Sequence, residues 1–375
     1  MTVPSRLISP CPTPFSDHIV DTVEGVDIPI RVFPGPSTQD AKLGKKPWLF
    51  WIHGGGWVGG KHLIPNSWIY PAFHALPLGL HIICVSYRFI PQVTLPQIYS
   101  DLVRSFQWCL TNLTSILGPD SIDVGRYVIG GDSAGGQLSS YCALALDGHF
   151  LPRPLINLNI YGSVDLADPH LSTPFDKPLP FNTPLKILQA AARDSDARNA
   201  KVTCPWVWEL PPQMDQSTLQ DFWGSEYTPT KEDEVRMDLN THYVRTGTRI
   251  KALFGFCDQD EAEKSSISTN TNEWDELVKS WSPLHCLKNR KKKKKKADGP
   301  MDYPPTVIMH GDDDTIVPIQ QSIEFADQLE ELGVAVKRIW CKGGGHCFEQ
   351  AIGGPEDEGW DEYIVPCIEF VKKYI

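Results

Sequence analysis

The chain has 375 residues and a net charge of −11, with 41% hydrophobic and 22% charged residues. This length and composition predict a folded globular protein, either one large domain with an elaboration or two domains. Seven positive charges fall in one run at 290–296, so the rest of the chain is still more acidic. An acidic body argues against a general nucleic-acid-binding protein.

The N-terminal region and the cysteines indicate where the protein works. The first 18 residues contain four prolines and no apolar core of a secretory signal. No stretch approaches the ~18 apolar residues that a membrane span needs. The ten cysteines are scattered and form no C-x-x-C pair. We therefore expect a cytoplasmic protein with reduced thiols; its oligomeric state, including a homodimer, is left open.

The first half of the chain alternates between strand and helix patterns. Residues 18–33 alternate apolar and polar side chains around Gly25, which predicts a hairpin. An amphipathic segment at 97–113 predicts a helix. Short apolar runs predict buried strands at 48–52, 81–87, 126–129 and 155–161. This alternation predicts an α/β fold with a mainly parallel central sheet and helices on both faces.

The alternation stops near residue 166. Residues 166–281 are rich in Pro, Asp, Trp and Thr, with helical pieces at 184–194 and 215–223. Because a structureless loop of this length is implausible, we predict an inserted cap, or lid, over the carboxyl edge of the sheet. The core then falls into two parts, 18–165 and 282–375.

The second part of the core resumes the α/β pattern. It contains predicted strands at 305–310 and 335–340 and predicted helices at 319–332 and 365–374. It also contains the basic run at 290–296, which is Arg290 followed by six lysines ending at Lys296. Like charges repel one another, so we predict a solvated, mobile loop there. The alternative is a nuclear-localisation signal or a site for an acidic partner.

A serine stands in a glycine-rich turn between strand 126–129 and a helical segment at 137–146. The turn reads GDSAGG from Gly131, which contains the pattern G-x-S-x-G around Ser133. Between a strand and a helix, this pattern presents the serine hydroxyl at the carboxyl edge of the sheet. It also needs small residues where the strand and the helix pass closely, and Gly131 and Gly135 fill those positions. We predict that Ser133 is a nucleophile.

Three consecutive glycines follow the buried strand at 48–52. Backbone N–H groups in such a segment can point into a site without obstruction by side chains. An oxyanion formed when a serine attacks a carbonyl needs donors of this kind. We predict that the N–H groups of Gly54 and Gly55, with that of Ala134 directly after the serine, form an oxyanion hole.

A base and an acid for the serine occur late in the chain. His346 follows strand 335–340 in a glycine-rich loop, and it has the best context among the eleven histidines. Three adjacent aspartates, Asp312, Asp313 and Asp314, follow strand 305–310. We favour Asp314, which directly precedes Thr315 and an apolar pair; the other two are more often turn formers or exposed charges. The chain order of nucleophile, acid and base is then Ser, Asp, His.

These residues together predict a catalytic triad and an acyl-enzyme mechanism. Ser133 attacks a carbonyl while His346 accepts its proton, and Asp314 orients the histidine. This chemistry needs no cofactor, and the scattered His, Cys and Asp residues have no metal-ligand spacing. Asp258 and Asp260 are a weaker alternative for the acid, because they lie inside the predicted cap.

Two motifs, HGGGW at 53–57 and GDSAGG at 131–136, resemble the oxyanion and nucleophile motifs of the hormone-sensitive-lipase-like carboxylesterases, which have the α/β-hydrolase fold. Residues 87–91 (YRFIP) resemble a segment between the two motifs, and Asp101 stands where that family has an acid. The resemblance covers 48–162 well and 281–347 in outline. It implies a serine esterase acting on short- to medium-chain acyl esters of small molecules.

The chain also departs from this family. The segment HGDDDTIVP replaces a single aspartate followed by Pro-Leu, and the predicted cap matches no pattern that we recognise. The large, aromatic-rich cap motivates the hypothesis of a natural-product ester from secondary metabolism. The same motifs also resemble those of aryl formamidases. A further alternative is a non-hydrolytic cyclase or ligand receptor, although such proteins usually lack a triad member.

Overall fold

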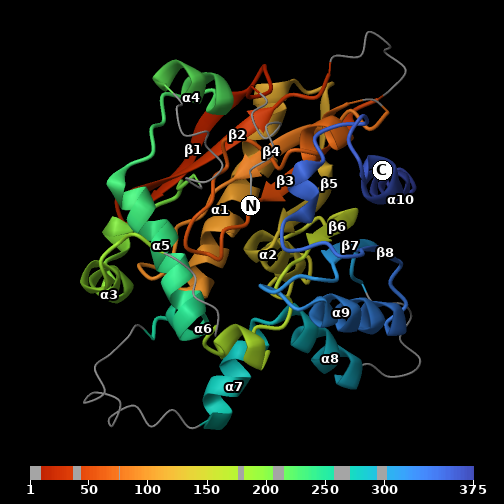
Figure 1. Cartoon of the computed structure of the whole chain (residues 1–375). Helices are drawn as coiled ribbons and strands as arrows, with labels where there is room; N and C mark the ends of the chain where they lie inside the picture. The colour runs from red at the N-terminus through yellow and green to blue at the C-terminus, as the bar shows by residue number, and fades with distance from the viewer. Residues whose placement is uncertain are drawn as a thin grey trace.

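A single eight-stranded sheet forms the centre of the computed structural model (Figure 1), which describes residues 10–36, 44–75, 77–175, 181–205, 215–256, 271–293 and 302–375. Within these residues the strand order is β1-β2-β4-β3-β5-β6-β7-β8. The pairs β1–β2 and β2–β4 are antiparallel, and all other neighbours are parallel. The prediction of a mainly parallel α/β sheet is confirmed.

The strands of the first half lie close to their predicted positions. The alternating segment forms the hairpin β1 (Ser16–Val23) and β2 (Val26–Phe33), which turns at Glu24 and Gly25. The apolar runs form β3 (Lys46–Ile52), β4 (His81–Val85), β5 (Ile122–Asp132) and β6 (Ile156–Ile160). The strand β5 begins four residues before the predicted run, because its first residues, IDVG, are only partly apolar.

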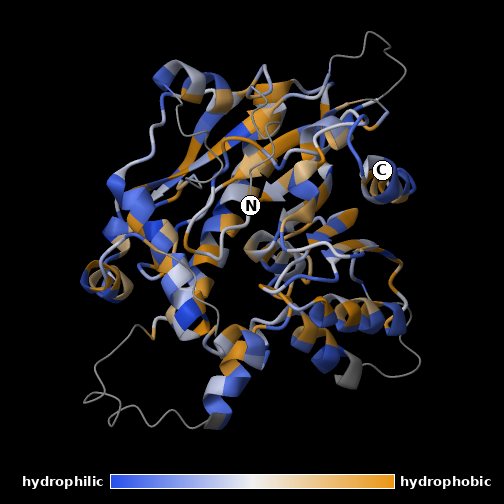
Figure 2. Cartoon of the chain, in the orientation of Figure 1, coloured by the Kyte–Doolittle hydropathy of each residue, from blue (hydrophilic) through white to orange (hydrophobic). Residues whose placement is uncertain are grey.

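Two helices of the first half pack beside these strands. Helix α1 (Leu95–Leu117) begins with a capping box, in which Thr94 N–H donates to Gln97 Oε1 at 2.9 Å. Helix α2 (Ala134–Cys142) starts directly after Ser133 and ends earlier than predicted, since Ala145 has a left-handed φ of 44°. Figure 2 shows hydrophobic residues concentrated in the strands and hydrophilic residues on the outer helices.

The second part of the core completes the sheet. It comprises α8 (Pro283–Lys293), β7 (Thr306–Gly311), α9 (Ile319–Glu331), β8 (Val336–Cys341) and α10 (Val365–Val371). The prediction of a loop for the basic run is wrong for residues 290–293, which continue α8. Lys and Arg are good helix formers, and cations are favourable near a helix C-terminus. Residues 294–296 lie outside the described residues.

The described residues of 166–281 form mainly helices, and this segment follows β6 and precedes β7 in the chain, two strands that are parallel neighbours in the sheet. Figure 1 shows most of these helices at the left and bottom of the view, with α4 (Gln216–Trp223) apart from the others beside β1. The two predicted helical pieces correspond to α3 and α4. Helix α5 (Lys231–Thr246) was not predicted, because its buried face includes polar residues such as Asp233, Arg236 and His242. The helices are α3 (Leu185–Arg193), α4 (Gln216–Trp223), α5 (Lys231–Thr246), α6 (Arg249–Leu253) and α7 (Thr271–Ser280).

Short helical turns join these elements. They are η1 (Tyr70–His74), η2 (Pro169–Ser172), η3 (Ala197–Asn199), η5 (Phe348–Ala351) and η6 (Trp360–Ile364). None of the described helices is both long and apolar enough to span a bilayer. The cysteines within the described residues are all free thiols.

Candidate active site

Ser133 occupies the sharp turn between β5 and α2. Its backbone has φ 50° and ψ −116°, a conformation that non-glycine residues rarely adopt. A Cβ on Gly131 would lie 2.5 Å from the carbonyl oxygen of Ile52, and one on Gly135 would collide with the same oxygen. Both positions therefore require glycine, and the close approach of strand and helix fixes the strained turn.

Three residues predicted from the sequence meet at this turn. His346 Nε2 lies 3.0 Å from Ser133 Oγ, and His346 Nδ1 lies 2.7 Å from Asp314 Oδ2. The serine follows β5, the aspartate follows β7 and the histidine follows β8. Since these strands are parallel, their carboxyl ends bring residues that are far apart in the sequence to one edge of the sheet.

Asp314 is the one of the three adjacent aspartates that contacts the histidine. Its side chain is fully buried, and its Oδ1 accepts hydrogen bonds from the N–H groups of Ile316 and Val317 at 2.8 and 3.0 Å. Asp312 and Asp313 are exposed, and Asp312 Oδ1 accepts from Gly343 N–H. The alternative acids, at positions 258 and 260, lie outside the described residues.

The carboxylate of Asp314 remains ionised despite its burial. Burial alone would raise its pKa, but hydrogen bonds to His310 and His346 outweigh this effect and hold the pKa well below its usual value. An ionised acid can orient the histidine and stabilise the imidazolium that forms when it accepts a proton.

A second histidine, which sequence reasoning did not select, also contacts this acid. His310 Nε2 lies 3.0 Å from Asp314 Oδ2, and its Nδ1 lies 2.7 Å from Ser322 Oγ. If the Ser322 hydroxyl donates to Nδ1, then Nε2 carries the proton and donates to the carboxylate. His310 is completely buried at the end of β7. The only sequence signal was a histidine four residues before the acid, which is weak by itself.

The glycine loop after β3 departs from the prediction at one residue. The Gly54 N–H donates to Asp132 Oδ1 at 3.0 Å, so it is occupied and does not face an incoming oxyanion. The carboxylate that directly precedes the nucleophile therefore fixes the loop. Among the described residues, the N–H groups of Gly55, Gly56 and Ala134 have no protein acceptor. These three are the available donors, with Gly56 in place of Gly54.

The segment at 87–91 holds this loop in place. The Tyr87 hydroxyl donates to the carbonyl of His53 at 2.9 Å, and the two rings stack with centroids 4.5 Å apart. Burial lowers the pKa of His53 to about 4, so its ring is neutral near pH 7. Arg88 and Asp101 form a buried ion pair at 2.9 Å, which anchors the segment to α1. Both residues therefore support the site without reaching it.

A buried acid lies behind the triad histidine. Glu349 Oε1 accepts a hydrogen bond from the Tyr161 hydroxyl at 2.5 Å, and the Tyr161 ring lies 4.7 Å from the ring of His346. Burial, together with the negative charge of Asp132, raises the pKa of Glu349 to about 8, although hydrogen bonds from Tyr161 and Asn66 oppose the shift. Glu349 is therefore largely protonated at neutral pH.

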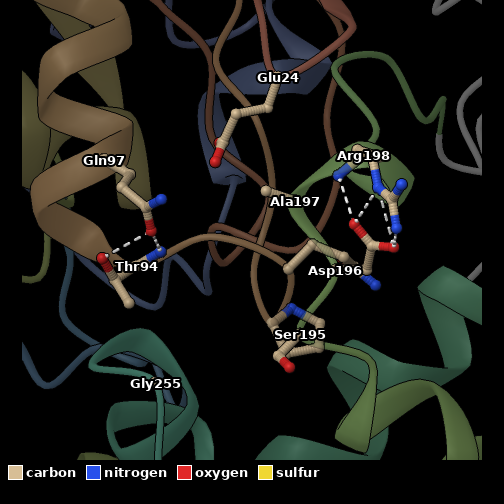
Figure 3. Close-up of a pocket in the computed structure, with 10 residues that line it drawn as sticks. Glu24, Thr94, Gln97, Ser195, Asp196, Ala197, Arg198 and Gly255 are labelled. Atoms are coloured by element: carbon tan, nitrogen blue, oxygen red, sulfur yellow. Dashed lines mark hydrogen bonds and ion pairs between the residues drawn. The ribbon is translucent and has the colours of Figure 1, made fainter.

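A separate pocket of about 680 Å³ lies between the start of α1 and the turn η3. Figure 3 shows the Thr94–Gln97 contact on one side of it and the Asp196–Arg198 ion pair on the other. None of the triad residues lines this pocket. The charged residues that line it are paired, Asp196 with Arg198 and Glu24 with Arg88. Within the described residues there is also no cluster of three or more His, Cys, Asp or Glu suited to a metal ion.

Comparisons with known proteins agree with this geometry. Residues 49–211 match a family described as having the alpha/beta hydrolase fold, and residues 255–372 match the prolyl oligopeptidase family. The chain has the α/β-hydrolase fold. The first match contains both the HGGGW and the GDSAGG motifs, so the resemblance that they predicted is confirmed. Among solved structures, this chain is similar in fold to a hyperthermophilic esterase from Pyrobaculum calidifontis, with a TM-score of 0.53 and 16% identity over 98% of this chain and 86% of that one.

Two curated relatives extend the comparison. This chain is 26% identical over 93% of its length to the non-reducing polyketide synthase Preu6 of Preussia isomera, but it spans 14% of that protein. It is 33% identical over 39% of its length to arylacetamide deacetylase of Bos taurus, and it spans 35% of that enzyme. The chain thus covers less than two fifths of either relative.

Proposed function

We propose that this α/β hydrolase is a serine hydrolase that cleaves a carboxylic ester through an acyl-enzyme intermediate. The observation that carries the proposal is the hydrogen-bonded series Ser133 Oγ, His346 and Asp314, with distances of 3.0 and 2.7 Å. It stands at a strained turn that presents the hydroxyl at the sheet edge. Nucleophile, base and orienting acid in this arrangement are what acyl transfer requires.

The geometry suggests a role for each group. His346 Nε2 accepts the proton of Ser133 as the oxygen attacks the ester carbonyl, and Asp314 stabilises the imidazolium. The N–H groups of Gly55, Gly56 and Ala134 donate to the tetrahedral oxyanion. His346 then protonates the leaving alcohol, and a water molecule activated by the same histidine hydrolyses the acyl-enzyme.

We propose that helices α3 to α7 act as a cap over this site. Their position is supported by Arg236 of α5, which donates to the carbonyls of Val58 and Ile90 at 3.2 and 3.1 Å. Both carbonyls lie in loops that follow the carboxyl ends of β3 and β4. Side chains of the cap would therefore select the substrate.

The substrate class is a further part of the proposal. The similarity over 93% of the chain to a polyketide synthase favours an ester of a natural-product intermediate. Panels of bulky aromatic esters, tested against acetyl and butyryl esters, will examine this. Turnover restricted to the small esters would argue against a natural-product substrate, and turnover of N-formylkynurenine would instead favour an aryl formamidase.

The decisive experiment compares the wild type with Ser133→Ala. We expect p-nitrophenyl butyrate hydrolysis to fall ~10³-fold or more in the variant, and covalent labelling by a fluorophosphonate to disappear. Ser217→Ala removes an exposed hydroxyl on α4 and serves as the matched control, with both readouts unchanged. Labelling that persists in Ser133→Ala would refute the assignment. A folded wild type with neither labelling nor turnover would favour the cyclase or receptor alternative.

A further inference from the structure

Two arginines of the proposed cap are buried without an ion pair to any described residue. Arg236 on α5 is 5% exposed and Arg249 at the start of α6 is 6% exposed. Hydrogen bonds stabilise the charge of Arg236. Its guanidinium donates to the carbonyls of Val58 and Ile90 and to the side-chain oxygen of Gln92 at 3.0 to 3.2 Å. Arg236 therefore has a structural role.

Arg249 has no comparable partners. No described residue accepts a hydrogen bond from it, and its Nε is buried without an acceptor. The guanidinium lies near the Trp57 ring, with Cζ 5.8 Å from the ring centroid. Burial lowers its pKa to about 10, so it still carries a positive charge at neutral pH. A buried charge without a partner is strongly unfavourable, so its presence calls for an explanation, and a bound anionic ligand would supply the missing partner.

This charge lies next to the catalytic machinery. Trp57 directly follows the glycines of the oxyanion loop, and its indole N–H donates to Gln137 Oε1 at 3.3 Å. Gln137 is on α2, where its N–H donates to the carbonyl of Ser133 at 3.1 Å. Arg249 is thus connected to the oxyanion loop through the Trp57 ring, and to α2 through the Trp57 indole and the Gln137 side chain.

A second unpartnered polar atom lies beside the same loop. Asn240 Oδ1, on α5, is buried and has no donor among the described residues. It lies against Gly56, where an added Cβ would be 2.5 Å from it. Two neighbouring cap helices therefore bring an unused cation and an unused amide oxygen to the loop formed by Gly56 and Trp57.

We propose that Arg249 binds a carboxylate of the substrate, so that the preferred ester carries a free carboxyl group. This inference rests on the proposed esterase function and narrows its substrate class. A guanidinium can donate two parallel hydrogen bonds to a carboxylate. One guanidinium supplies one positive charge, which a carboxylate neutralises, whereas a phosphate dianion would leave excess negative charge in a buried site. Asn240 Oδ1 is placed to accept from a hydroxyl or an amide of the same substrate.

The test uses matched neutral and anionic esters. The acyl-side pair is p-nitrophenyl butyrate and mono-p-nitrophenyl succinate; the alcohol-side pair is phenyl butyrate and 4-carboxyphenyl butyrate. For the wild type we expect kcat/KM to favour the carboxylate member of one pair by ~10-fold or more. Arg249→Met should reduce kcat/KM for that member by about 10- to 100-fold and change the neutral member less than about threefold. Arg249→Lys keeps the charge but loses the paired donors. Its kcat/KM for the carboxylate member should lie between those of the wild type and Arg249→Met.

The controls separate substrate binding from folding. Arg245→Met removes the same charge from an exposed position on α5 and should leave both members of each pair unchanged. Inhibition of the wild type by glutarate, compared with glutaramide, needs no variant and should favour the diacid. Equal inhibition together with no carboxylate preference in either pair overturns the proposal. An equal loss of kcat/KM for neutral and anionic esters in Arg249→Met would also overturn the proposal, because it would mean that Arg249 has a structural role.

These outcomes differ from a failure of the esterase proposal. Hydrolysis of p-nitrophenyl butyrate that depends on Ser133, without any preference for carboxylates, would overturn the Arg249 assignment alone. Absence of both labelling and hydrolysis in folded wild-type protein would instead overturn the proposed function.

Discussion

At the scale of single residues, burial and hydrogen bonding distinguish three chemically identical aspartates. Asp314 is buried and accepts hydrogen bonds at both carboxylate oxygens, whereas Asp312 and Asp313 face solvent. The sequence favoured Asp314 because of its place before an apolar pair. It could not reveal His310 as a second partner of the acid, since that contact depends on how the loop after β7 folds back on the strand.

The aspartates allow a sharp test of the triad assignment. Asp314→Asn preserves the shape but can no longer stabilise the imidazolium, so we expect kcat to fall ~10³-fold or more. Asp313→Asn, one residue away and exposed, should change kcat less than about threefold. Steady-state kinetics with p-nitrophenyl butyrate measure both. Similar losses in the two variants would mean that Asp314 is not the orienting acid.

At the scale of elements, the crossing of β5 and α2 depends on two glycines. Gly135→Ala places a methyl group against the backbone of β3, and neither partner can move without disturbing the sheet. We expect the free energy of unfolding to fall by about 2–3 kcal/mol or more, as in other overpacked cores. Gly345→Ala is the matched control, because its added Cβ would meet no atom within 4 Å, and it should change stability by less than about 0.5 kcal/mol. Urea denaturation measures both, and equal midpoints would contradict this account of the turn.

The strands that the sequence predicted most clearly are those of the sheet interior. Strands such as β3, β4 and β6 are buried on both faces, so their apolar runs are unambiguous. Helix α5 was not predicted because it buries charged side chains such as Arg236, whose partners come from distant loops. Gly54 was misassigned for a similar reason. The motif shows that N–H groups are available in the loop, but only the fold shows that Asp132 occupies one of them.

At the scale of the whole molecule, the sheet order explains why three residues spread over more than half of the chain form one site. The strands β5, β7 and β8 lie within four neighbouring positions of the sheet, and their carboxyl ends are adjacent. Alternation of strands and helices was enough to predict this edge. The arrangement of α3 to α7 was not predictable in the same way, because their packing follows no periodic pattern, and the proposed substrate preference depends on it.

Stability of the whole molecule should depend on the protonation of Glu349. Its pKa is about 8 in the folded protein, against 4.5 for an ordinary glutamate. Between these values the folded protein retains a proton that the unfolded chain has released. The free energy of unfolding therefore falls as pH rises through this window, and the loss is complete above about pH 8.

Glu349→Gln isolates this contribution, because the amide is neutral at every pH and can still accept the hydrogen bond from Tyr161. We expect the variant to gain stability relative to the wild type as pH rises from 5 to 8.5, with a difference of a few kcal/mol at the upper end. Glu358→Gln makes the same chemical change at an exposed position and should leave the pH profile unaltered. Urea denaturation at pH 5, 7 and 8.5 measures the three profiles. Parallel profiles for the wild type and Glu349→Gln would show that Glu349 is already ionised in the folded protein, and a negative charge would then lie beneath the triad at neutral pH.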